Sequence, residues 1–238
     1  MASVREVFGG VLAKFSFHEL EILSARELAP RFRLFELHGE TLKGTSCAAG
    51  DKLQLMLGGA TRTYTPFAFD PERGSLSVLA FVHGDSPGSR WGRAARVADK
   101  LRVFGPRGSI ALAALAQPTL LFGDETSFGV ARALLDALPD AKGASTFVFE
   151  VAETNEASRV LAQLGVEGAQ IFTRRADDSH LREVAENIAD ALGRMPGASV
   201  VLTGRAPAIQ GLQRALKARS LPVDKSKAYW APGKRGLD

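Results

Sequence analysis

A change of hydrophobic rhythm near residue 117 constrains the fold of this chain more than any other feature. Before that point, apolar and polar residues alternate in short runs bounded by Gly, Pro or Asp, as at 32–37 and 52–57. After it, unbroken apolar runs such as 119–123 are followed by stretches with helical spacing. Alternation is typical of antiparallel strands, whereas continuous apolar strands between helices indicate a parallel sheet covered on both faces. The chain therefore contains two differently built parts.

The first part is predicted to be a small antiparallel barrel. Six strands are expected, at 20–23, 32–37, 52–57, 63–69, 76–82 and 100–104. The segment Asp70-Pro71-Glu72-Arg73-Gly74 has strong turn chemistry and predicts a hairpin between two of them. Six short antiparallel strands at this spacing favour a six-stranded Greek-key barrel.

The second part is predicted to be a Rossmann-like parallel α/β domain. Strands are expected at 119–123, 146–151, 170–173 and 199–203, with helices at 127–138, 156–164, 179–192 and 207–218. We place the domain boundary between residues 116 and 117, which gives a barrel domain over 1–116 and an α/β domain over 117–238. The last 25 residues, 214–238, carry seven bases and two acids, and we interpret them as a basic C-terminal tail.

Composition excludes several classes of protein. Hydrophobic residues make up 45% and charged residues 24% of the 238 residues, which is ordinary for a globular chain and excludes disorder and fibre. The apolar runs fall short of the roughly 18 residues that a membrane helix needs, and no secretory signal is visible, so we expect a cytoplasmic protein without membrane insertion. The net charge of +4 is not gathered into a basic stripe, which argues against nucleic-acid binding.

The cysteine and histidine content limits the redox chemistry that the chain can perform by itself. Cys47 is the only cysteine, which excludes an internal disulfide, a cysteine-ligated iron–sulfur cluster and a CxxC pair. The histidines are far apart and form no zinc-binding pattern, so no metal site is expected; they are His18, His38, His83 and His180. Any redox chemistry must therefore come from a bound cofactor.

One short motif suggests which cofactor. Arg62-Thr63-Tyr64-Thr65 fits the R-x-Y-[ST] element of the ferredoxin–NADP reductase superfamily, which shares the layout of a barrel followed by an α/β domain. A guanidinium can clamp the flavin pyrophosphate, an aromatic ring can pack against the isoalloxazine or ribityl group, and the Thr65 hydroxyl can meet flavin N5. Alone, the four residues equally describe an ordinary edge strand.

Further segments in the same order strengthen the resemblance. They are Phe81-Val82-His83-Gly84-Asp85-Ser86-Pro87-Gly88-Ser89-Arg90-Trp91, Gly105-Pro106-Arg107-Gly108-Ser109, Gly123-Asp124-Glu125-Thr126 and Tyr229-Trp230-Ala231-Pro232-Gly233. In that order, they resemble the FVLHG…GPASRW, GPRGS, GDET and YWxxG segments of the siderophore-interacting protein family. The resemblance extends from residue 62 to residue 233. It implies a protein that contains FAD and uses NAD(P)H to reduce ferric siderophores.

The segment after the barrel strands supplies further candidate flavin ligands. Gly88 and Ser89 are expected to open a short helix running to residue 95, whose free amides and positive dipole end suit a pyrophosphate. Ser89 would add a hydroxyl, and Gly88 would let the phosphate approach the backbone; a plain capped surface helix is the alternative. The resemblance adds Gly84 and His83 as flavin contacts, although His83 could instead be a partly buried structural residue. Trp91 is expected in the core, and 105–109 as a tight turn.

The candidate NAD(P)H ligands follow the parallel strands. The first loop of an open α/β sheet is where a nucleotide binds, and here it reads Gly123-Asp124-Glu125-Thr126. Two acids oppose a pyrophosphate, so either the nucleotide is held weakly there or the acids point away. Thr126 is expected either to cap the following helix or to meet the ligand.

Arginines at two other strand ends bear on the choice between NADPH and NADH. In the superfamily, the strand end at Thr173-Arg174-Arg175 usually carries a hydroxyl and an arginine that hold the 2′-phosphate of NADP, so we predict a preference for NADPH. The alternative is a pair of solvated arginines. Arg205 stands after Gly204 where the family typically has an acid; it either adds a phosphate contact or changes the preference.

The leading hypothesis is a flavin enzyme without a side-chain general acid or base. NADPH or NADH delivers a hydride to flavin N5, near Thr65, and the flavin passes electrons singly to a ferric siderophore, releasing Fe(II). The basic tail, with Arg31, Arg33 and Lys52, would attract anionic chelates. Two alternatives stay open: a diaphorase that reduces a flavodoxin or ferredoxin, and a non-catalytic flavin-binding module. The sequence does not reveal the siderophore or the oligomeric state.

Overall fold

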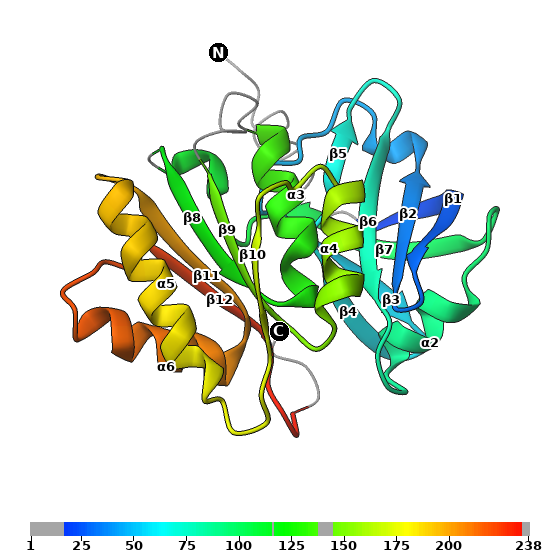
Figure 1. Ribbon diagram of the computed structural model, residues 1–238. Helices are drawn as coiled ribbons and strands as arrows, with labels where there is room; N and C mark the ends of the chain where they lie inside the picture. The colour runs from blue at the N-terminus through cyan, green and yellow to red at the C-terminus, as the bar shows by residue number, and fades with distance from the viewer. Residues whose placement is uncertain (1–16, 116, 138–144, 235–238) are drawn as a thin grey trace, which may run out of the picture. The chain divides into compact units, whose positions relative to one another are not determined.

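The computed structural model describes residues 17–115, 117–137 and 145–234 (Figure 1). The chain divides between Ala111 and Leu112 into two compact units. The sequence places the division five residues later, and Ala116 itself lies outside the described residues. The difference arises because the 3₁₀ turn η3 (Leu112–Ala114) packs against helix α3 (Phe128–Ala137) of the second unit.

The first unit is an antiparallel sheet of seven strands in the order β4-β3-β7-β1-β2-β6-β5. The strands are β1 (Phe17–Ala29), β2 (Phe32–His38), β3 (Lys52–Leu57), β4 (Ala60–Tyr64), β5 (Phe67–Asp70), β6 (Ser75–Phe81) and β7 (Lys100–Arg107). The predicted number of six is wrong because the expected strand at 63–69 is two strands, separated at Pro66, which has no N–H to donate to a ladder. The pair Gly58-Gly59, both with positive φ, turns β3 into β4.

The connection from β4 to β5 forces the first sheet to close on itself. These two strands form opposite edges of the sheet, yet only Thr65 and Pro66 separate them in the chain. At about 3.3–3.6 Å per residue, so short a link holds the two edges within roughly 11 Å of each other. The sheet therefore curls into a barrel around a core that includes Leu20, Ile22, Phe35, Leu37, Leu53, Leu55, Val78 and Val103.

Helix α2 (Pro87–Ala94) is fixed at both ends. At its start, Ser86 is the N-cap and accepts a hydrogen bond from the Ser89 N–H. At its other end, Arg33 of β2 donates to the carbonyl oxygens of Gly92, Arg93 and Ala95, at 2.6, 3.2 and 3.2 Å. Arg33 therefore satisfies the carbonyls at the end of the helix, and the attraction of anionic chelates by its charge stays a prediction.

Trp91 of α2 packs into the barrel core, as predicted. Its ring centroid lies 4.6 Å from that of Phe35 and 5.5 Å from that of Tyr64. The indole thereby joins the helix, β2 and β4.

Replacing Arg33 by Ala tests whether this side chain holds α2 in place. We expect Arg33→Ala to lower the free energy of unfolding by about 2 kcal/mol, because three carbonyl groups lose a charged donor. Denaturant unfolding measures the effect, and Arg33→Lys, which keeps the positive charge, should restore part of it. An unchanged unfolding midpoint in Arg33→Ala would contradict this assignment.

The second unit is a parallel sheet of five strands in the order β10-β9-β8-β11-β12. Its strands are β8 (Thr119–Gly123), β9 (Thr146–Val151), β10 (Gln170–Thr173), β11 (Ser199–Arg205) and β12 (Lys225–Trp230), and its other helices are η4 (Glu125–Ser127), α4 (Thr154–Gln163), α5 (His180–Arg194) and α6 (Ala206–Lys217). The predicted bounds of β8, β9 and β10 are confirmed to the residue. The last residue predicted for the first helix, Leu138, lies outside the described part of the chain.

The helices cover the sheet, and its strands all point one way. Helices α5 and α6 lie side by side on one face and form a core with the inward residues of β8 and β11 (Figure 1). Because every strand is parallel, all five carboxyl ends meet at one edge of the sheet. In an open α/β sheet this edge is the one that binds ligands.

Part of the segment interpreted as a basic tail is a strand. Residues Lys225–Trp230 form β12, which pairs in parallel with β11. The pattern of apolar and polar residues did not reveal this strand, because it begins Lys-Ser-Lys. Lysines are common on the edge strands of sheets, where they discourage pairing with further strands. Within the described ranges, no helix is long and apolar enough to cross a bilayer.

Candidate functional site

The R-x-Y-T motif and the start of α2 form one site in the first unit. A Cβ at Gly88 would lie 3.0 Å from the Tyr64 hydroxyl and 3.4 Å from Cγ of Arg62. The first turn of α2 therefore lies directly against the side chains of β4, and the missing side chain at Gly88 permits this approach. Two segments that are separate in the sequence thus meet in the structure.

This arrangement fits FAD. The first amides of a helix have no acceptor within the helix, and α2 opens at Pro87-Gly88 beside the half-exposed Arg62. Pro87 has no N–H and the Ser89 N–H bonds to Ser86, so the Gly88 N–H and the Arg62 guanidinium are the donors that this site offers a pyrophosphate. The guanidinium of Arg62 is oriented by a 2.7 Å hydrogen bond from Nη1 to the Thr61 carbonyl.

Tyr64 is held in its protonated form. Burial raises the pKa of its phenol above the ordinary value, and the nearby charge of Arg62 opposes this only in part. At neutral pH Tyr64 therefore presents a hydroxyl that can donate a hydrogen bond. Thr65 follows it immediately, half-buried between β4 and Pro66.

The loop before α2 is built around Ser89. Its buried hydroxyl donates to the His83 carbonyl at 2.6 Å and lies within hydrogen-bond distance of the His83 N–H and the Ser86 hydroxyl, at 3.0 and 3.1 Å. With these contacts the hydroxyl is saturated, so Ser89 shapes the loop, which does not match the role of phosphate ligand that the sequence suggested. Gly84 in the same loop has φ +58°, a left-handed conformation that glycine adopts without strain.

Two other sequence-based interpretations near this loop are wrong. His83 is exposed and stacks on Phe81 with centroids 4.8 Å apart, so it is not a partly buried structural residue. Residues 105–107 do not form a turn, because they belong to β7, where Arg107 pairs with Lys52 and donates to the Gln54 side chain.

At the carboxyl edge of the second sheet, the two acids of the GDET segment point inward. Asp124 is the N-cap of η4 and accepts from the Thr126 N–H at 2.9 Å and from the Thr126 hydroxyl. It also accepts from Nε1 of Trp230 at 2.7 Å. Both Asp124 and Glu125 are buried, so of the two alternatives the structure supports acids that point away from a ligand. Thr126 donates hydrogen bonds to Asp124, which is the N-cap residue, so Thr126 is not itself the N-cap.

Burial raises the pKa of Asp124 to about 6, although the hydrogen bonds from Thr126 and Trp230 and the charge of Arg174 lower it. The negative charge of Glu125 adds to the increase. Because the folded state holds this proton more tightly than the unfolded state does, the contribution of Asp124 to stability is greatest below pH 4 and falls as the pH rises towards 6.

Replacing Asp124 by Asn isolates this titration. We expect the difference in unfolding free energy, Asp124→Asn minus wild type, to increase between pH 4 and 7 by up to about 3 kcal/mol, because asparagine avoids the cost of a buried charge. Asparagine keeps an oxygen that can accept from Trp230. Denaturant unfolding at several pH values measures this difference, and a difference that does not change with pH would contradict the assignment.

Arg174 and Arg205, both expected to contact the nucleotide, are engaged inside the unit. Arg174 pairs with Glu125 and donates to the Glu150 carbonyl oxygen at 2.9 Å. Arg205 donates from Nε to Glu150 at 2.9 Å and from Nη1 to Asp178 at 3.1 Å. Neither guanidinium is turned towards solvent in the way that a 2′-phosphate ligand requires.

Thr173 and Arg175 are the predicted NADP residues that do face solvent. Both are exposed, at the end of β10 and in the loop that follows it. The Arg175 guanidinium makes only long contacts, 3.5 Å to the Ser179 hydroxyl and 4.0 Å to the Glu183 carboxylate. A hydroxyl and a guanidinium therefore remain available at this strand end.

Sequence reasoning missed the residues that organise this edge. Glu150 is fully buried on β9 and accepts from His180 at 2.6 Å and from Arg205. Asp178 completes the pairing of Arg205. One signal was present: Glu150 interrupts the apolar run Thr-Phe-Val-Phe-Glu-Val of a buried strand, and a buried carboxylate needs partners.

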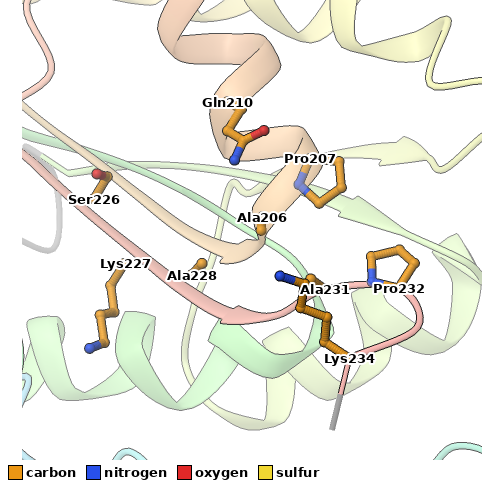
Figure 2. A pocket seen from close by; sticks show the side chains of 9 residues that line it. All are labelled: Ala206, Pro207, Gln210, Ser226, Lys227, Ala228, Ala231, Pro232 and Lys234. Atoms are coloured by element: carbon orange, nitrogen blue, oxygen red, sulfur yellow. The ribbon is translucent and has the colours of Figure 1, made fainter. Parts of the chain in front are cut away.

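A pocket of about 600 Å³ lies where α6 begins beside β12 (Figure 2). It is lined by Ala206, Pro207, Gln210, Ser226, Lys227, Ala228, Ala231, Pro232 and Lys234. Two lysines and no acid contribute to this lining. Among the residues that the structure describes, no group of three or more His, Cys, Asp or Glu side chains could hold a metal ion.

Comparison with known proteins agrees with the geometry of the first unit. Residues 57–110 match the sequence model of the siderophore-interacting FAD-binding domain. This segment of the chain is therefore similar to that domain. The match includes β4, the loop at residues 82–86 and α2, which are the elements that form the site around Gly88.

A curated relative from Escherichia coli (strain K12), an NADPH-dependent ferric-chelate reductase, is 28% identical over 146 residues. The match covers 51% of this chain and 57% of the relative, so the similarity spans little more than half of that protein.

Solved structures share the complete fold. A siderophore utilization protein from T. fusca is similar with a TM-score of 0.71 and 24% identity, covering 94% of this chain and 96% of that one. The ferredoxin reductase of carbazole 1,9a-dioxygenase is similar with a TM-score of 0.72 and 17% identity, covering 90% and 69%. The fold is that of the ferredoxin reductase-like proteins, with an antiparallel barrel and a parallel α/β unit.

Proposed function

We propose that this protein is an FAD-containing oxidoreductase that uses NADPH to reduce a ferric siderophore in the cytoplasm and releases the iron as Fe(II). The observation that carries the proposal is the site formed by β4 and α2 around Gly88, within a siderophore-interacting FAD-binding domain. The reductase activity of the E. coli relative supports the same reaction. One NADPH supplies two electrons, so two Fe(III) chelates become Fe(II), with release of NADP⁺ and one proton.

The chain itself binds and orients the cofactor. Bound FAD supplies the chemistry, since a flavin accepts a hydride and returns electrons one at a time. Arg62 and the Gly88 amide would hold the pyrophosphate, Tyr64 would pack against the flavin, and Thr65 would offer a hydroxyl to its reactive nitrogen. Gly84 and the exposed His83 would contact the cofactor from the loop that Ser89 shapes.

Replacing Arg62 by Ala tests this arrangement. We expect Arg62→Ala to raise the Kd for FAD about 10- to 100-fold, because the pyrophosphate loses a charged donor. Fluorescence titration of the apoprotein with FAD measures the Kd. Arg102→Ala is the matched control, since the guanidinium of Arg102 on β7 lies over the ring of Phe17 on β1. Equal affinity in the Arg62→Ala variant and the wild type would exclude Arg62 from the site.

We assign the 2′-phosphate of NADPH to Thr173 and Arg175, the two exposed donors at the end of β10. Arg174 and Arg205 are left out of this assignment because they form ion pairs with Glu125 and Glu150 inside the unit. Thr126 is left out because it donates to the Asp124 carboxylate. This assignment keeps the predicted preference for NADPH and changes the residues responsible for it.

Arg175→Ala is expected to raise the KM for NADPH about tenfold and to change the KM for NADH less than twofold, because only NADPH carries the extra phosphate. Steady-state oxidation of each nucleotide with ferricyanide as acceptor gives both constants. Arg194→Ala, at the far end of α5, serves as the control. If the KM values for both nucleotides rise equally in Arg175→Ala, Arg175 does not recognise the 2′-phosphate.

The function is tested with the full chain, loaded with FAD, and an anionic ferric siderophore. We expect NADPH-dependent Fe(II) formation, trapped by an Fe(II) chelator, that slows as salt rises because Lys227 and Lys234 of the pocket attract anions (Figure 2). Reduction of a flavodoxin or ferredoxin without Fe(II) formation would identify a carrier reductase instead. NADPH that reduces no acceptor would leave a non-catalytic flavin module.

A further inference from the structure

The end of β10 presents Thr173 to solvent and the loop before α5 presents Arg175, and Asp178 fixes the shape of that loop. Asp178 has φ +60°, in the left-handed region that residues other than glycine rarely adopt. Its carboxylate accepts from Arg205 at 3.1 Å through Nη1 and also from Nη2. The surrounding contacts therefore hold a conformation that the backbone alone does not favour.

Arg205 joins this loop to the centre of the sheet. On its other side, the guanidinium donates from Nε and Nη2 to the two oxygens of Glu150, at 2.9 and 3.2 Å. One planar group thus binds two carboxylates at once, a geometry that lysine cannot reproduce. Burial alone would lower the pKa of Arg205, but the hydrogen bonds and charges of Glu150 and Asp178 raise it, so the group stays charged.

Arg205 cannot reach a nucleotide directly because its side chain is only 7% exposed and both of its edges are occupied. Its effect on a ligand must pass through Asp178. If Arg205 were absent, the loop would lose its anchor, and an unpaired carboxylate would remain three residues from Arg175, where it would repel a phosphate.

We propose that Arg205 is a positioning residue that sets the selectivity for nucleotides with a 2′-phosphate. It holds the loop after β10 in the shape that places Thr173 and Arg175 around that phosphate. The inference rests on the proposed use of NADPH. It also gives a role to the arginine that departs from the family pattern after Gly204, since that arginine serves the loop and makes no phosphate contact.

The test measures binding of 2′,5′-ADP and of 5′-ADP to the full chain by titration calorimetry, which does not depend on flavin reduction. We expect wild type to bind 2′,5′-ADP at least tenfold more tightly than 5′-ADP. Arg205→Ala should lose most of this difference while its affinity for 5′-ADP changes less than twofold. Arg205→Lys should recover only part of the difference.

A second variant separates positioning from charge and covers the case in which Arg205→Ala fails to fold. Asp178→Gly releases the anchor, and glycine adopts the left-handed conformation without strain. If the carboxylate only repelled phosphate, this variant would bind 2′,5′-ADP more tightly than wild type; loss of positioning predicts binding about tenfold weaker. Arg219→Ala is the control, because the Arg219 guanidinium donates to the Ala215 carbonyl of α6.

The outcomes distinguish this inference from the proposed function. Full discrimination between the two nucleotides in both Arg205→Ala and Asp178→Gly would overturn the positioning role and leave NADPH use intact. Equal affinity of wild type for the two nucleotides would overturn the NADPH preference itself, and the positioning role with it. Thermal unfolding of each variant confirms that the protein tested is folded.

Discussion

The two-residue connection Thr65-Pro66 is the constraint on which the proposed flavin site depends. It joins opposite edges of the first sheet, so the barrel must close. Strand β4 then lies where the two edges meet, and α2 packs against it. The motif residues of β4 then meet the start of α2 across Gly88, where a Cβ would lie only 3.0 Å from the Tyr64 hydroxyl. Barrel closure and the cofactor site are consequences of the same short link.

In the second unit, the buried carboxylate of Glu150 has the corresponding structural role. Glu150 has no exposed surface, and it binds Arg205, His180 and, more distantly, Arg174. A buried charge without partners would cost several kcal/mol, so these partners are held firmly. They come from the ends of β10 and β11 and from the start of α5, which means that one side chain orders much of the carboxyl edge.

Local sequence patterns predicted most of the fold, because strand alternation, apolar runs and turn residues act over short distances. The bounds of β8, β9 and β10 and the start of α2 came from such patterns. The predictions that failed concerned features that depend on the folded structure. Pro66 divides the strand predicted at 63–69, the lysines of β12 lie on an edge strand of the sheet, and the Ser89 hydroxyl bonds within its own loop. The inward orientation of the Arg174 and Arg205 side chains could not be predicted. The acidic residues that they bind, such as Glu125 and Glu150, lie far away in the sequence and share no motif with them.

The central claim is that electrons pass from NADPH through FAD on this chain to a ferric chelate. The most direct measurement is anaerobic stopped-flow absorbance of the FAD-loaded protein, first with one equivalent of NADPH and then with a ferric siderophore and an Fe(II) trap. We predict that the flavin absorbance near 450 nm is lost with NADPH and returns with the chelate, with two Fe(II) trapped per NADPH. A flavin that NADPH bleaches but the ferric chelate does not restore would contradict the claim.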